Sequence, residues 1–361
     1  MPAKRIIYLD GMRGLAILGV CFFHAYSHWE EIQPFNQSEI FKIFFSYGFL
    51  GVNLFFSISG FVIYASLRNS DNILMFGVAR YIRLAPAMFI ASIFLYFSSL
   101  FIPERPIGIA NIQDFLPSLT FIDPKFLTKI LSINVKSLDG AFWSLYIEVQ
   151  FYFVSSVIFF LLKDKELRGL LSMFILYLAI EMLTKIGLDN IYVLSIEKIL
   201  SNLGAKYYGW FLIGIYCYKY KHSPLTSNLY SLFLICLITV FLDFHKSGGK
   251  MSILIASAVV ALLFIFPLFN KKLKLFLSSN IFLFFGFISY PLYLIHQNLV
   301  TGLAIKLYNS GIELPNFFYP LPFLILAVLL SFFIAKLEPL IKTYFFKKVP
   351  IKIFYVKLKR D

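Results

Sequence analysis

Ten stretches of mostly apolar residues recur along the 361-residue chain, and each is close to the length of a membrane-spanning helix. Such a helix needs about 20 residues to cross the hydrocarbon core of a bilayer. Only 14% of the residues are charged and 59% are hydrophobic, whereas soluble domains carry about 25% charged residues. We therefore predict an all-α polytopic integral membrane protein with about ten transmembrane helices, at 6–28, 43–67, 84–102, 141–162, 170–187, 203–218, 225–243, 252–269, 281–305 and 317–335. The segment 189–202 is expected to be a re-entrant or interfacial helix.

The net charge of +14 has a topological explanation. Lys and Arg gather at the N-terminus, in alternate loops and in the tail, whereas the first loop on the other side carries Glu30, Glu31 and Glu39. Cytoplasmic loops of membrane proteins are enriched in Lys and Arg, so we expect both termini to be cytoplasmic and no binding to nucleic acid. We assign 1–340 to a transmembrane domain and 341–361 to a basic-aromatic tail, which is expected to lie on the anionic lipids of the inner leaflet.

Ionisable residues within the predicted spans mark candidate sites, because a charge at membrane depth costs several kcal/mol. The first span carries Asp10, Arg13, His24 and His28, the last one turn beyond His24 on the same face. Arg13 and His24 are 11 residues apart, which places them on one helix face about 16 Å from each other. Asp10 and Arg13 are spaced to pair on the helix surface. An Arg13 that only reaches the inner surface, and a His24 that only bonds a neighbouring helix, remain open alternatives.

Later spans add further candidates. Glu148 lies within the span at 141–162, and His296 follows Pro291 within the span at 281–305. His24, Glu148 and His296 are all predicted in the outer half of the membrane. Arg80 and Arg83 lie at the inner surface, where two arginines on one helix face could bind phosphate groups or simply anchor the span.

These segments resemble the membrane acyltransferase-3 family, the polytopic O-acyltransferases that modify bacterial surface glycans. The matching segments occur in the family's order and are LDGMRGLAILGVCFFHA (residues 9–25, with the Arg13–His24 spacing), GVNLFFSISGFVI (51–63), ARYIRLAP (79–86), WSLYIEVQFY (143–152) and ISYPLYLIH (288–296). Two departures are that Asn53 stands where the family usually has an acidic residue, and Val149 where a second glutamate is common. The chain ends soon after the tenth span, so we expect the form without an SGNH-hydrolase domain.

The resemblance implies transfer of an acyl group, usually acetyl, from cytosolic acyl-CoA to a hydroxyl of a cell-surface or exported glycan, at the inner (plasma) membrane. The expected partners are acyl-CoA, a glycan or lipid-linked saccharide, and membrane lipids. No bound cofactor and no metal is expected.

The candidate site residues are given these expected roles. His24 is the candidate base or covalent acyl carrier, and Glu148 orients or charges an imidazole. Arg13 binds the donor's phosphates or carbonyl, and Arg80 and Arg83 also bind the donor. The possible pocket residues are Asn53, Ser59, Trp143, Ser144, Tyr152, Tyr290, Tyr293 and His296.

Two other classes of protein remain possible from the residues. A proton-coupled transporter of a small molecule or glycan would also place His and Glu at membrane depth, and it would move its substrate without consuming acyl-CoA. A non-catalytic membrane scaffold would need no alignment of Arg13 with His24.

Overall fold

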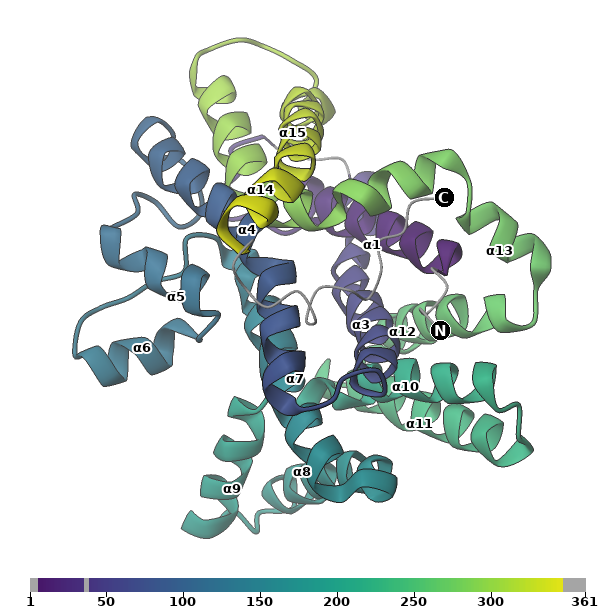
Figure 1. Ribbon diagram of the computed structural model, residues 1–361. Coiled ribbons are helices and arrows are strands. Elements are labelled where there is room, and N and C mark those ends of the chain that lie inside the picture. Colours follow the sequence, from purple (N-terminus) through teal and green to yellow (C-terminus); the bar gives the residue numbers. More distant parts are fainter. Residues whose placement is uncertain (1–5, 36–38, 347–361) are drawn as a thin grey trace. The chain divides into compact units, whose positions relative to one another are not determined.

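The computed structural model describes residues 6–35 and 39–346, and within these ranges every regular element is a helix (Figure 1). The α-helices are α1 (Ile7–Tyr26), α2 (Glu39–Phe45), α3 (Gly51–Leu67), α4 (Ile73–Phe101), α5 (Phe115–Thr120), α6 (Pro124–Leu131), α7 (Trp143–Leu162), α8 (Glu166–Lys185), α9 (Ile191–Asn202), α10 (Tyr208–His222), α11 (Thr226–Lys246), α12 (Met251–Ile265), α13 (Lys271–Leu277), α14 (Asn280–Asn309) and α15 (Leu321–Phe346). Short 3₁₀ turns join several of them. The predicted all-α fold is confirmed.

Each predicted span is found as a helix, and one of these helices is short for a membrane span. Eight helical segments in the described ranges are long and apolar enough to cross a membrane, and the bent pair α13–α14 makes nine. The span expected at 203–218 is α10, whose 15 residues are fewer than a bilayer crossing usually takes. The chain is thus a multi-pass membrane protein.

Two predicted boundaries differ from the structure, and one pair of helices is bent. α4 begins at Ile73 rather than residue 84, because the apolar run 73–78 continues the helix, so Arg80 and Arg83 lie inside it. The bend of 59° falls between α13 and α14, and Pro291 lies within the single helix α14. Residues 341–346 of the predicted tail extend α15, and its remainder, 347–361, lies outside the described residues.

The chain divides into two compact units. The first comprises residues 1–52, 79–146 and 274–361, and the second comprises residues 53–78 and 147–273.

In the first unit, glycines allow α1 to pack directly on the backbone of α13 and α14. A methyl group on Gly11 would lie 1.6 Å from the Leu277 carbonyl oxygen, and one on Gly286 would lie 2.0 Å from the Asp10 carbonyl oxygen. A methyl group on Gly14 would lie 2.1 Å from the carbonyl oxygen of Phe282. Small residues at such crossings let membrane helices approach closely, and here they bring α1 against α14 along its length.

The contacts also fix the relative direction of three helices in the first unit. From the N-terminal to the C-terminal half of α14, Gly286 meets Asp10 and His296 meets His24, so α1 and α14 run parallel. Tyr290 and Gly302 likewise contact, in this order, Leu84 of α4 and Ile102 just after its end. Successive spans cross a membrane in opposite directions, so the first, third and ninth predicted spans must run in the same direction. The helices α1, α4 and α14 do so.

In the second unit, α3 packs on α10 in the same manner. A methyl group on Gly60 would lie 2.0 Å from the Phe211 carbonyl oxygen, and one on Gly214 would lie 1.9 Å from that of Ser57. The hydroxyl of Ser57 donates a 3.0 Å hydrogen bond to the Trp210 carbonyl. Ser57 and Gly60 of the 51–63 segment therefore serve helix packing.

We predict that Gly286→Ala destabilises the first unit by about 1–3 kcal/mol, because the added methyl group cannot fit against the α1 backbone. Gly77→Ala is the matched control: Gly77 also lies in a helix, but a methyl group there would have no neighbour within 4 Å, and the change is expected to be neutral or stabilising by up to about 1 kcal/mol. Thermal unfolding of both variants in detergent compares the two. Equal stability of the variants would contradict the close approach of α1 and α14.

Candidate functional site

Two membrane-depth histidines from opposite ends of the chain contact each other in the first unit. Nε2 of His296 on α14 lies 3.0 Å from Nδ1 of His24 on α1, and the ring centroids are 5.0 Å apart. His296 is 1% exposed, while His24 is half-buried. The sequence predicts both residues in the outer half of the membrane, and the structure brings them together.

The hydrogen-bond partners assign a tautomer to each ring. Nδ1 of His296 lies 2.9 Å from the Tyr293 carbonyl and 3.2 Å from the Leu292 carbonyl, so it must be the donor. In a neutral imidazole the other nitrogen is then an acceptor, and Nε2 of His296 accepts a hydrogen bond from Nδ1 of His24. That N–H also lies 3.1 Å from the Val20 carbonyl. The proton of His24 is thus held on Nδ1, which leaves an unprotonated Nε2 that can act as a base.

A hydrogen-bonded turn holds α14 beside this pair. The carboxylate of Asp139, which is fully buried, accepts hydrogen bonds from the backbone N–H of Ala141 (2.9 Å) and of Asn298 (3.1 Å). The Asn298 amide donates in turn to the Leu138 carbonyl (2.9 Å). Burial raises the pKa of Asp139 to about 7, although these N–H groups and the nearby Arg105 favour its charged form. Asp139 and Asn298 were not singled out from the sequence, because Asp139 precedes the apolar stretch and resembles an ordinary helix cap.

The predicted pocket residues Ser144 and Tyr293 lie on the two sides of this turn. The hydroxyl of Tyr293 donates to the Ala141 carbonyl at 2.8 Å, and the Ser144 hydroxyl lies 2.7 Å from the Tyr293 oxygen. The Tyr293 ring centroid is 5.6 Å from that of His296. Trp143, at the start of α7, is 41% exposed. The two hydroxyl groups therefore belong to the surroundings of the histidine pair.

The arginine candidates of the first unit lie nearer the N-terminal ends of their helices. Nη1 of Arg13 donates to Oδ1 of Asp10 at 2.8 Å, which confirms the predicted pair. On α4, Arg80 is half-buried and Arg83 is exposed. The hydroxyl of Tyr290 donates to the Leu84 carbonyl at 3.0 Å, one residue after Arg83, and so ties α14 to α4 there.

The second unit contains the other predicted acid. The carboxylate of Glu148 on α7 accepts hydrogen bonds from the hydroxyls of Ser59 on α3 and Tyr152 one turn along α7. These three residues come from two of the segments that carry the family resemblance. The role of Glu148 toward an imidazole stays a prediction.

Asn53, which stands where the family usually has an acidic residue, lies in the second unit. It contacts a carboxylate that no sequence motif indicated. Its amide donates to Oδ2 of Asp243 on α11 at 3.2 Å. The same oxygen accepts from Nε1 of Trp210 (3.2 Å) and from the hydroxyl of Ser257 (3.0 Å). A carboxylate therefore lies beside the neutral Asn53, and it comes from a helix 190 residues further along the chain.

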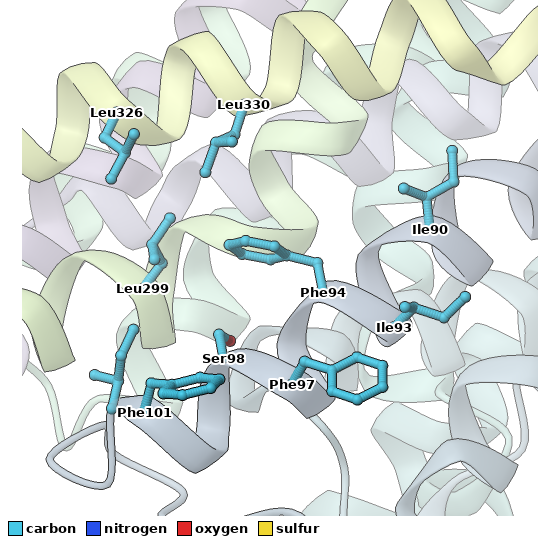
Figure 2. Close-up of a pocket in the computed structure, with 10 residues that line it drawn as sticks. Ile90, Ile93, Phe94, Phe97, Ser98, Phe101, Leu299, Leu326 and Leu330 are labelled. Atoms are coloured by element: carbon cyan, nitrogen blue, oxygen red, sulfur yellow. The ribbon is translucent and has the colours of Figure 1, made fainter.

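An apolar groove of about 620 Å³ lies in the first unit between α4, α14 and α15. Figure 2 shows Phe94 and Phe97 of α4, Leu299 of α14, and Leu326 and Leu330 of α15 around it. Its one polar lining residue, Ser98, donates to the Leu95 carbonyl (3.1 Å). The groove is suited to hydrocarbon and contains no group for acid–base chemistry, so the histidine pair is the candidate active site.

The family model described as "Acyltransferase domain" matches residues 6–336. The chain is also 31% identical over 180 residues to the O-acetyltransferase OatA of Staphylococcus aureus, in strains NCTC 8325 / PS 47, COL and MRSA252. The alignment covers 45% of this chain and 26% of each relative, so the chain spans about a quarter of their length. No solved structure matches.

We predict that His296→Leu lowers turnover about 10²-fold, because His24 then loses the acceptor that holds its Nδ1 proton and its orientation. His296→Gln keeps an acceptor oxygen and is expected to restore part of this loss. The measurement is the acyl-transfer rate at saturating substrates, with helical content by circular dichroism as the folding control. Equal rates for both variants and the parent protein would show that His296 does not orient His24.

Proposed function

Because the chain belongs to the acyltransferase-3 family, we propose that it is a membrane-bound O-acyltransferase that moves an acyl group, expected to be acetyl, from cytosolic acyl-CoA to a hydroxyl of a cell-surface or exported glycan. The observation that carries the proposal is the hydrogen bond between His24 and His296, which leaves Nε2 of His24 free to accept a proton. The OatA relatives are named as O-acetyltransferases, which supports the same chemistry.

In the proposed reaction Nε2 of His24 removes the proton of the acceptor hydroxyl as its oxygen attacks the thioester carbonyl. His296 accepts the Nδ1–H bond throughout, and this bond strengthens when His24 becomes charged, as in the imidazole-orienting arrangement of hydrolase triads. The new C–O bond forms, the C–S bond breaks, and His24 returns the proton to the departing thiolate. In a route with a covalent acyl-His24 intermediate, Nε2 of His24 attacks the thioester carbonyl, the C–N bond forms and the C–S bond breaks. The acceptor oxygen then attacks this acyl carbon, the C–O bond forms, the C–N bond breaks, and the hydroxyl proton passes through Nε2 to the thiolate.

The arginines are the residues proposed to bind the acyl-CoA donor. Coenzyme A carries several phosphates and is cytosolic, and Arg80 and Arg83 lie near the end of α4 that the charge distribution assigns to the cytoplasm. Guanidinium groups bind phosphates through paired, charge-assisted hydrogen bonds. Arg13, held by Asp10, is the candidate for the donor's phosphates or carbonyl. The acceptor, a glycan or lipid-linked saccharide, approaches from the outer face of the inner membrane.

We predict that His24→Gln lowers glycan acylation on the order of 10²–10⁴-fold, the usual contribution of a general base, while acyl-CoA binding persists. The measurement is the ester-linked acyl content of the surface glycan, with the amount of membrane protein as a control. His222→Gln is the matched variant, because His222 is an exposed histidine at the end of α10, and it should acylate normally.

Near-normal acylation by His24→Gln would move the base role to another group. Substrate flux across the membrane without any consumption of acyl-CoA would support the transporter in place of the acyltransferase.

We predict that Arg80→Ala and Arg83→Ala each raise the KM for acyl-CoA, because each removes charge-assisted contacts worth about 1.5–3 kcal/mol. The turnover at saturating donor should change less than the KM. Arg68→Ala, a control at the neighbouring loop, should leave the donor KM unchanged. An unchanged donor KM in both α4 variants would assign these arginines to membrane anchoring.

A further inference from the structure

Phe23, near the end of α1, and His28 and Trp29, just after it, belong to a group of rings that adjoins His24. The ring centroid of His28 lies 5.1 Å from that of His24, at a steep interplanar angle of 83°. The centroids of Phe23 and Trp29 lie 4.9 Å and 4.5 Å from that of His28. A continuous row of rings therefore leads from His296 through His24 and His28 to Trp29.

The backbone of this segment is held by its own hydrogen bonds. The N–H of His28 donates to the Phe23 carbonyl (3.0 Å), and the Trp29 carbonyl accepts from the N–H of Gln33 (2.9 Å) and of Ile32 (3.2 Å). The Gln33 amide reaches back to the Ala25 carbonyl at 3.3 Å. The rings are thus positioned before any ligand arrives, which lowers the entropic cost of binding.

The indole N–H of Trp29 is buried and has no hydrogen-bond partner among the residues that the structure describes. Folded proteins pair almost all buried donors, so an acceptor atom that enters beside these rings would complete the hydrogen bonding of the indole. The neighbouring His28 is exposed, so the row of rings opens to the surface at this point.

We propose that Phe23, His28 and Trp29 form the subsite that holds the acceptor's sugar ring beside His24. A sugar presents C–H faces that pack on aromatic rings and a rim of hydroxyl oxygens that accept an indole N–H. Aromatic walls with a few placed polar groups are typical of small-molecule sites, and Trp offers both an apolar face and a donor. The inference rests on the proposed function and adds the residues that recognise its substrate.

A cell-surface glycan would approach from the outer side of the membrane, which is where the C-terminal end of α1 is expected. The charge distribution places the start of α1 in the cytoplasm and its C-terminal end outside. Beyond Trp29, Glu30 pairs with Lys42 of α2 at 3.6 Å, so the ring cluster is bordered by polar groups. An interfacial Trp that only anchors the helix is the competing explanation, and it depends on the ring rather than on the N–H.

Substitutions at Trp29 separate these explanations. The probe is a set of glycan fragments released from the surface of the source cell and freed of esters by mild alkali, and its binding to the full chain in lipid nanodiscs is measured without acyl-CoA. Trp29→Phe keeps an aromatic ring but loses the N–H, and it should weaken fragment binding about three- to tenfold. Trp29→Ala should weaken it about 10- to 100-fold. Phe44→Leu, at a 77% exposed aromatic of α2, is the matched control and should bind normally.

Acyl-CoA binding should be the same in all four proteins, which shows that the Trp29 variants are folded. Unchanged fragment binding in both Trp29 variants would overturn the subsite. Weaker fragment binding in Trp29→Ala but unchanged fragment binding in Trp29→Phe would also overturn the subsite and assign Trp29 to the anchoring role. Because binding is read without the donor, a wild-type protein that binds fragments but never acylates them would refute the proposed function and leave the subsite intact.

Discussion

The close approach of α1 to α14 is the constraint on which the candidate active site depends. Gly11, Gly14 and Gly286 let the two backbones touch, and a bond of 3.0 Å between two imidazoles can form only between helices that lie this near. Bulkier residues at the crossing would leave two isolated membrane-depth histidines. The chemistry proposed for His24 therefore rests on residues that carry no functional group at all.

The polar groups of the site are also supported by a second layer of hydrogen bonds. Asp139 binds the backbone of α14 at Asn298, two residues after His296, and Tyr293 binds the Ala141 carbonyl on the other side of the same turn. In the second unit, Asp243 gathers three donors on one oxygen. Such networks make the placement of the functional side chains specific, because each buried acceptor that lost its donors would incur a desolvation cost.

The sequence predicted the fold class and most helices, because apolar runs of membrane length leave few other structures. It also predicted the pair Asp10–Arg13, which depends only on helical spacing. It did not predict that His24 meets His296, since their shared depth restricts the contact but only the glycine crossing determines it. Asp243 was missed for the same reason: its partner Asn53 is 190 residues away, and no periodicity within a helix indicates a contact between helices. The start of α4 was misplaced because the short apolar run before Arg80 was assigned to a loop.

The glycine crossing and the histidine pair are separated by the same number of residues on both helices: Gly14 precedes His24 by ten, and Gly286 precedes His296 by ten. At about 1.5 Å per residue this places the two histidines at matched heights, about 15 Å above the crossing. A single inserted or deleted residue in either interval would turn one ring by about 100° around its helix axis. The length of each interval is therefore a structural requirement in its own right, because it sets both the height and the direction of a ring.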